Sequence, residues 1–347
     1  MIVFLLIIMY LFIVIVTKGK RIDNNLSLDK KNTLRYKGFA AILIFLHHIS
    51  QQIALPTPFM IFRYVGFILV GIFFFLSGFS LMKNYIEKDS YLTGFLWKRI
   101  PGIYIPYWFA ALLLYIVEEL INNPHVDFNF IKVLLGDTLI YTKLWFTTSI
   151  VIMYIIFYVC GYLAKKRIKV MFSLVFFAIC IYISLCELAG LQSQWSASCL
   201  SFGVGIIWAA YQEKIERACK KRYTVLLFLS TIAFLTLFSV RLSLSYFGYD
   251  TGIMQTILRN VVSISFVILI LLIMQKVVIE SKSLIWFGRI SYEFYIVHFV
   301  LIYPFLSALG RSNSFVLLLF VFSILISLII HRFSKCICTK INEIVIR

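Results

Sequence analysis

Two adjacent histidines, His47 and His48, interrupt a long apolar stretch of the chain. The ordinary pKa of imidazole suits it to accept a proton near neutral pH, so a histidine in this setting is a candidate general base. Lys37 precedes His48 by eleven residues, which is close to three helical turns, so both side chains lie on one helix face about 16 Å apart. His47 points about 100° away. We therefore predict that His48 is the catalytic base, with His47 as the second candidate and a structural role as the alternative.

A second polar group lies in the apolar segment 290–308, where Glu293 stands among aromatic and aliphatic residues. A carboxylate inside a bilayer costs roughly 2.5–3.5 kcal/mol unless it is paired or hydrated. In the same segment Ser291, Tyr295 and His298 follow a spacing of four and then three residues, which places them on one helix face. We predict that Glu293 assists the catalytic histidine and that the other three side chains line the substrate pocket. The alternative is that these groups only hydrogen bond neighbouring helices.

The chain also carries cations where a phosphate-bearing substrate would bind. Lys98 and Arg99 stand just before Pro101, a residue that suits the first turn of a helix. The Arg99 guanidinium offers a fork of donors to phosphate, and Lys37 offers a point charge. Arg99 and Lys37 are therefore predicted to bind the donor substrate. The alternative for Arg99 is an ordinary anchor on the basic side of a membrane.

Two further residues are assigned to the substrate pocket. Ser77 follows an aromatic run in which Gly71 and Gly78 stand seven residues apart, a spacing that allows another helix to approach one face closely. No G-x-S-x-G turn surrounds Ser77, so it is not predicted to be a nucleophile. Trp145 opens a later apolar segment, where an aromatic residue at the membrane interface is the alternative.

Eleven apolar segments must position these residues, and most are long enough to cross the ~30 Å hydrocarbon layer of a membrane. They span residues 2–16, 38–56, 65–82, 101–121, 144–163, 170–188, 196–211, 223–241, 260–275, 290–308 and 314–331. Of the 33 Lys and Arg residues, 27 lie in alternate connections and 6 in the others. Because cytoplasmic loops hold the excess of basic residues, we predict a plasma-membrane protein with its N-terminus outside and its C-terminus in the cytoplasm.

The composition indicates the same class of protein. The chain is 62% hydrophobic and contains 34 Phe, and spans in lipid must be helical because no water satisfies their backbone groups. The predicted fold class is all-α, a polytopic membrane bundle of about eleven helices. The basic loops explain the formal charge of +18, so nucleic acid is excluded as a partner.

The domain organisation follows from the same segments. Basic residues come after segment 2–16 and not before it, the reverse of a signal peptide, so residues 1–17 are predicted to be an additional N-terminal transmembrane helix. Residues 34–331 form the membrane domain, and 332–347 form a short cytoplasmic tail. The seven cysteines contain no CxxC pair, so neither a metal site nor a disulfide framework is predicted. No tightly bound cofactor is expected, and a homo-oligomer is left open.

Five motifs occur in order along the chain: Lys37-Gly38 followed by His48, FFFLSGF at 73–79, FLWKRIPGIYIPYW at 95–108, LWF at 144–146 and GRISYEFYIVH at 288–298. In this order and spacing the chain resembles the integral-membrane acyltransferase 3 family over about residues 34–330. The resemblance implies a bundle of about ten helices. It also implies transfer of an acyl group from a cytoplasmic donor such as acetyl-CoA to a hydroxyl of an extracytoplasmic carbohydrate.

The resemblance also implies roles for single residues. His48 matches the family's catalytic histidine, and Lys37 matches its basic residue. Two positions depart from the family pattern: Lys37 replaces the usual arginine and so lacks a bidentate fork, and Gly102 stands where a second basic residue is common. The additional first helix also lies outside the common pattern.

We therefore expect an O-acyltransferase, and specifically an O-acetyltransferase, whose partners are acyl-CoA, a cell-surface carbohydrate and the lipid bilayer. The alternative is a proton-coupled transporter or flippase of a lipid-linked saccharide, in which Glu293 and the histidines relay protons. Transporters often contain internal repeats with paired broken helices. We find no such repeat in the sequence, which favours the enzyme.

Overall fold

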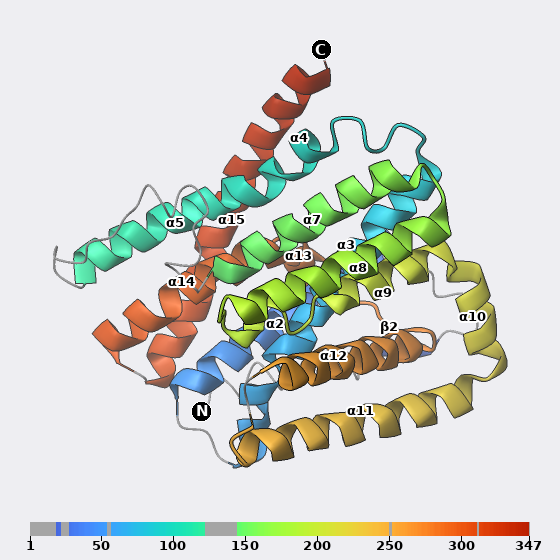
Figure 1. The fold of residues 1–347 in the computed structure, drawn as a ribbon. Helices are drawn as coiled ribbons and strands as arrows, with labels where there is room; N and C mark the ends of the chain where they lie inside the picture. The colour runs from blue at the N-terminus through green and yellow to red at the C-terminus, as the bar shows by residue number, and fades with distance from the viewer. Residues whose placement is uncertain are drawn as a thin grey trace.

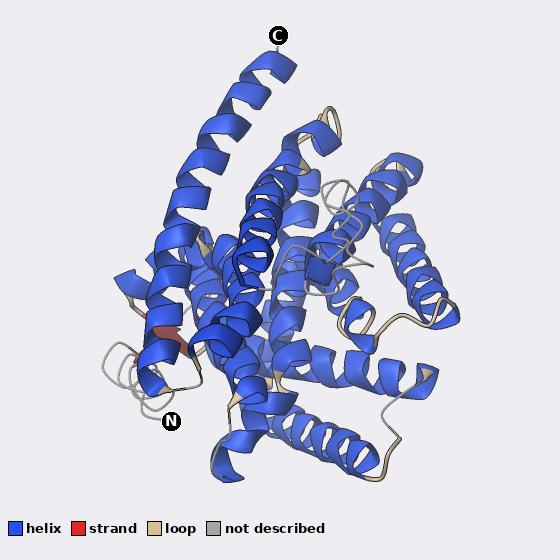
Figure 2. Cartoon of the chain, turned by 90° about the vertical axis from the view of Figure 1, so that its left-hand side faces the viewer, coloured by secondary structure: helices blue, strands red, loops and turns tan. Residues whose placement is uncertain are grey.

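The computed structural model is a bundle of long helices (Figure 1), and it describes residues 19–21, 28–53, 57–121, 144–249, 252–310 and 312–346. The long helices are α2 (Lys30–Gln52), α3 (Gly66–Glu87), α5 (Pro101–Ile121), α7 (Trp145–Ala164), α8 (Ile168–Leu188), α9 (Leu200–Ala210), α11 (Tyr223–Tyr246), α12 (Ile253–Met274), α14 (Ser291–Leu309) and α15 (Asn313–Ile346). Shorter helices connect them: α4 (Phe95–Arg99), α10 (Gln212–Lys221), α13 (Lys282–Arg289) and the 3-10 helices Thr57–Tyr64 and Ser193–Trp195. The two short strands β1 (Gly19–Arg21) and β2 (Val277–Ile279) pair antiparallel (Figure 2).

Each predicted apolar segment from 38–56 onward coincides with one of these long helices. The first segment, 2–16, and the connection 122–143 lie outside the described residues. Six described helices are long and apolar enough to cross a membrane, or seven if the bent pair α13 and α14 is one span. Helix α9 falls short because it has 11 residues. The all-helical membrane class is thus confirmed, whereas the count of about eleven spans stays a prediction.

The last helix is longer than the sequence indicated. Helix α15 runs without interruption over 34 residues, and its C-terminal end projects beyond the rest of the bundle in both views (Figures 1 and 2). The predicted tail, 332–347, therefore continues this helix as far as Ile346. The physical reason is that residues 332–346 contain neither proline nor glycine, so nothing in them breaks a helix.

The helices differ in how far they are buried. Of the six candidate spans, α3 is the most enclosed and α11 the least. Helix α11 lies at the edge of the bundle beside α12 (Figure 1), and it exposes Phe228, Leu229 and Leu235. A continuous apolar surface of this kind is unfavourable in water and ordinary against lipid. The interior around α2, α3 and α14 is therefore where a site can be built.

Glycines bring α3 and α9 into close contact. A Cβ atom on Gly78 would collide with the backbone oxygen of Phe202, and one on Gly205 would collide with that of Phe75. A Cβ on Gly71, on the same face of α3, would collide with another side chain. The close helix approach predicted for Gly71 and Gly78 is thus confirmed.

Glycines also bring α2 and α13 into close contact. A Cβ on Gly38 would collide with the backbone oxygen of Leu284, and one on Gly288 would collide with that of Leu34. Helix α13 then meets α14 at an angle of 69°. After this bend α14 packs against α2, where Phe294 contacts Phe45 and His298 contacts His48.

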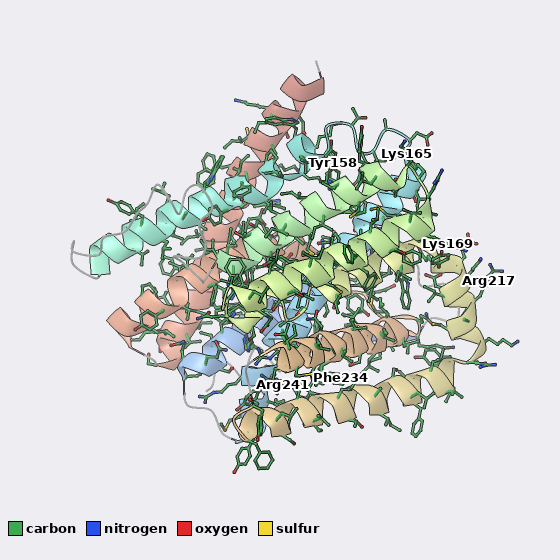
Figure 3. The ribbon with its side chains drawn as sticks, viewed as in Figure 1. Tyr158, Lys165, Lys169, Arg217, Phe234 and Arg241 are labelled. Atoms are coloured by element: carbon green, nitrogen blue, oxygen red, sulfur yellow. The ribbon has the colours of Figure 1, made fainter. Side chains whose placement is uncertain are left out.

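Basic residues gather at one end of the helices (Figure 3). Lys165, Lys169 and Arg217 lie together at that end, while Arg241 lies at the other end of α11, with Phe234 between. This separation matches the charge bias from which the cytoplasmic side was predicted. Cytoplasmic exposure of the basic end remains a prediction.

That prediction can be checked by labelling single cysteines. In a cysteine-free background, a membrane-impermeant maleimide added to intact cells should label Gln192→Cys and spare Ser90→Cys, because Ser90 lies in a basic connection and Gln192 in one without cations. Both positions are exposed, so access does not bias the comparison. After the cells are broken, both should react. The reverse pattern in intact cells would invert the orientation and the side from which the donor enters.

Candidate active site

His48 and His298 come together in the interior although they are 250 residues apart. His48 Nδ1 lies 2.9 Å from His298 Nε2, and the His48 ring stacks on Phe299 with centroids 4.3 Å apart. His298 is fully buried. Packing of α2 against α14 creates this contact, and neither segment alone specifies it.

The hydrogen bonds also determine which nitrogens carry protons. His298 Nδ1 lies 2.5 Å from the backbone oxygen of Phe294. A carbonyl only accepts, so His298 Nδ1 must donate, and a neutral ring then accepts at Nε2. His48 Nδ1 is consequently the donor of the bond between the two rings. Nε2 of a neutral His48 is left with a lone pair, which is the form that a general base requires.

His47 is held differently. Its Nδ1 lies 2.7 Å from the backbone oxygen of Phe62, and its Nε2 lies 3.3 Å from the side-chain nitrogen of Gln51. The ring also packs against Gly66, where a Cβ would collide with it. Both nitrogens of His47 are therefore engaged, so the geometry favours His48 as the base.

A cavity of about 210 Å³ opens beside the histidines. Its described lining residues are Ile44, His47, His48, Gln51, Gly66, Phe67, Val70, Trp145, Gln194, Ser198, Tyr295 and Phe299. Apart from the histidines, its polar side chains are two amides and two hydroxyls, and no Asp, Glu, Lys or Arg is among these described residues. The cavity therefore suits an uncharged polar ligand. Trp145 belongs to its wall, and its role as a substrate-pocket residue stays a prediction.

Glu293 lies elsewhere. Its carboxylate pairs with His331 of α15, with Oε1 2.8 Å from Nδ1, and the residue is 7% exposed. Five residues separate Glu293 from His298, which turns the two side chains about 140° apart around α14. The described contacts therefore pair His48 with His298 and pair Glu293 with His331.

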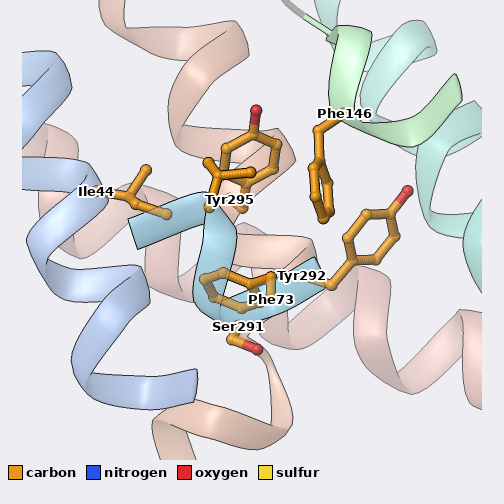
Figure 4. A pocket seen from close by; sticks show the side chains of 7 residues that line it. Ile44, Phe73, Phe146, Ser291, Tyr292 and Tyr295 are labelled. Atoms are coloured by element: carbon orange, nitrogen blue, oxygen red, sulfur yellow. The ribbon is translucent and has the colours of Figure 1, made fainter. Parts of the chain in front are cut away.

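The predicted stripe on α14 does face the interior. Ser291, Tyr295 and His298 are all buried, and Ser291 Oγ donates to the backbone oxygen of Gly288 at 3.0 Å. Ser291 and Tyr295 line a second, smaller pocket with Phe146 and other apolar residues (Figure 4). Tyr295 belongs to both pockets.

The predicted donor residues lie within electrostatic range of each other, because the charge of Arg99 acts on Lys37. Arg99 donates a 2.8 Å hydrogen bond to the hydroxyl of Tyr91. Burial raises the pKa of Tyr91, against the opposing effect of Arg99, so this hydroxyl keeps its proton and can donate it. Cations and a hydroxyl donor are groups that bind phosphate, and the role of Lys37 and Arg99 in binding the donor stays a prediction.

Ser77 belongs to this end of the molecule. It lies within hydrogen-bonding reach of Tyr154, which is itself close to Arg99. Ser77 is not among the residues that line either of the two histidine-side pockets. The structure thus places Ser77 beside the cations and Trp145 beside the histidines, although both were predicted as pocket residues.

Several residues near the site were not predicted from the sequence to belong to it. His331 offered a signal, since it ends an otherwise apolar segment. Gln51 stands one turn after His47, which would also have indicated it. Gln194 lies in the 3-10 helix Ser193–Trp195 and Ser198 in the turn that follows it, and both elements are too short for a periodic pattern to mark a residue as inward-facing.

The fold and the site together define a multi-helix membrane protein in which His48, hydrogen bonded to the buried His298, lines a cavity. The family model described as "Acyltransferase domain" matches residues 36–332. The chain therefore belongs to the acyltransferase 3 family and is a membrane acyltransferase. Comparisons with curated proteins and with solved structures found no match.

Proposed function

We propose that the protein transfers an acyl group from cytoplasmic acyl-CoA to a hydroxyl of an extracytoplasmic carbohydrate, as an O-acyltransferase of the plasma membrane. One observation carries the proposal: the hydrogen bonds from Phe294 through His298 to His48 leave a basic nitrogen on a ring that lines the cavity. A hydroxyl in this cavity meets a base of the correct tautomer. The bonds that hold the ring keep it oriented before the substrate arrives.

The reaction is a direct acyl transfer. His48 Nε2 takes the proton of the acceptor hydroxyl while its oxygen attacks the thioester carbonyl. The new C–O bond forms, the C–S bond breaks, and the departing CoA sulfur takes the proton back from His48, so free CoA thiol and an ester result. His298 accepts from His48 Nδ1 throughout and stabilises the imidazolium that forms, as a positioning residue.

The donor end agrees with acyl-CoA, and with acetyl-CoA in particular because the pocket that shares residues with the histidine cavity offers about 10 Å³. Lys37 and Arg99 would hold the CoA phosphates at the cytoplasmic end of α2. The nucleotide is too highly charged to enter the apolar interior, so only its acyl-bearing arm would reach His48.

The acceptor end agrees with a cell-surface carbohydrate. Amides and hydroxyls supply neutral hydrogen bonds, and Trp145 supplies an aromatic face. The lining contains no cation for an anionic acceptor and no carboxylate for an amine among its described residues.

Thioester turnover separates this proposal from a transporter or flippase. Purified protein in detergent should release free CoA thiol from acetyl-CoA, and a sugar acceptor should raise the rate. A carrier that only relays protons would leave the thioester intact. Mass spectrometry of surface polysaccharide from cells with and without the protein would then identify the acceptor.

The proposed donor site gives a prediction about Lys37. Lys37→Arg should keep or lower the KM for acetyl-CoA, since a guanidinium retains the charge and adds a fork. Lys37→Gln should raise that KM about tenfold, the effect of losing one charge-assisted contact, and should weaken its dependence on salt. Initial rates at two ionic strengths measure both effects.

Lys98→Gln is the matched control, because Lys98 is exposed and hydrogen bonds to the backbone oxygen of Thr93. It should leave the KM unchanged. An unaltered KM in Lys37→Gln, with full activity, would remove Lys37 from the donor site and leave Arg99 as its specific phosphate ligand.

A further inference from the structure

Two pockets lie next to each other in the interior and share a wall. One is the histidine cavity of about 210 Å³. The other, which we call the inner pocket, offers about 10 Å³, which is room for roughly one water molecule. Three residues line both pockets: Ile44, Val70 and Tyr295. We call these three residues the neck.

The neck lies between the two predicted ends of the reaction. Lys37, Ile44 and His48 are spaced by seven and then four residues, so they lie on one face of α2. Ile44 is therefore about 10 Å from the cation end and about 6 Å from the histidine, measured along the helix axis. Any group that moves from the cations to His48 along this face must pass Ile44.

The inner pocket is mostly apolar, and two of its polar side chains, Ser291 and Tyr292, hydrogen bond to the backbone. Its ring Phe146 lies 5.3 Å from that of Tyr295, and Figure 4 shows Phe146 between Tyr295 and Tyr292. The Tyr292 hydroxyl donates to the backbone oxygen of Ile103 at 3.0 Å, and Ser291 donates to Gly288. An uncharged, apolar group is thus what the inner pocket accepts.

We propose that Ile44, Val70 and Tyr295 form a size-selective neck through which the acyl group of the donor thioester reaches His48, and that the neck restricts the enzyme to short acyl chains. This inference rests on the proposed acyl-CoA function. A diphosphate cannot enter an apolar neck, whereas a two-carbon acyl group needs only a small displacement of Ile44 and Val70. The inner pocket has room for about one water molecule, so each added methylene of the acyl chain requires a further displacement of its closely packed walls.

Enlarging the neck provides the test. Thiol release from acetyl-CoA, butyryl-CoA and hexanoyl-CoA is measured for purified protein in detergent. Ile44→Ala and Val70→Ala should each raise the ratio of hexanoyl to acetyl turnover about tenfold, the usual effect of pocket size on discrimination. The matched controls are Ile42→Ala and Val262→Ala, which remove the same groups from buried residues that line neither pocket. Their ratio should equal that of the wild type.

Blocking the neck gives the opposite result. Val70→Phe should abolish thiol release from all three donors while CoA itself still raises the melting temperature, because the cations lie outside the neck. Full turnover by Val70→Phe would overturn the inference. If the ratio of hexanoyl to acetyl turnover were unchanged in both Ile44→Ala and Val70→Ala while the wild type was active, the neck would also be overturned. The proposed function would then remain intact. A wild type that neither binds CoA nor releases thiol would overturn the proposed function and the neck together.

Discussion

His48→Ala should lower the rate of acyl transfer by roughly 10²–10⁴-fold, which is the usual contribution of a general base. The loss should fall on kcat, because the cavity walls that bind the acceptor remain. Turnover of acetyl-CoA in the presence of acceptor measures it. Expression and melting temperature should change little, since the ring contacts Phe299 and His298 but fills no tightly enclosed core position.

His47→Ala is the matched control for this variant. It removes the same ring from the neighbouring position, and both nitrogens of His47 already have hydrogen-bond partners, in Phe62 and Gln51. Its effect on kcat should be far smaller. If His47→Ala proved the more damaging of the two, the base would be assigned to the wrong histidine.

His298→Phe should lower kcat by about 10²–10⁴-fold as well, although His298 touches no substrate in the proposed reaction. The phenyl ring keeps the volume and removes the acceptor for His48 Nδ1, so the catalytic ring loses its orientation and its tautomer. His298→Gln should recover part of this rate, because its side-chain oxygen accepts the same hydrogen bond. The acceptor KM should stay close to that of the wild type in both variants.

Glu293→Gln tests whether His48 is supported by His298 alone or also by the carboxylate of Glu293. The described partner of Glu293 is His331, so the variant should lower the melting temperature more than it lowers kcat. If Glu293→Gln lost as much kcat as His298→Phe while keeping the melting temperature of the wild type, Glu293 would have a direct role in the reaction.

Equal losses of kcat in His298→Phe and His298→Gln would contradict the role of the hydrogen bond between the His48 and His298 rings.

Much of the architecture was determined by the sequence itself. A chain in lipid must satisfy its backbone within each helix, so long apolar segments become helices wherever they occur, and the described helices coincide with the predicted segments. The helical period likewise places Lys37 and His48 on one face of α2, and Ser291, Tyr295 and His298 on one face of α14. These are local consequences of 3.6 residues per turn.

Only the tertiary structure decided which faces meet. The period says that Glu293 and His298 point in different directions, but it does not say that one meets His331 and the other His48. That choice depends on how helices pack, and here glycines such as Gly38 and Gly288 let α13 approach α2 backbone to backbone. The bend before Ser291 then turns α14 toward the histidines. Gln194 and Ser198 reach the cavity from a connection without regular periodicity, because side-chain direction there is set by contacts with distant helices and not by the local chain.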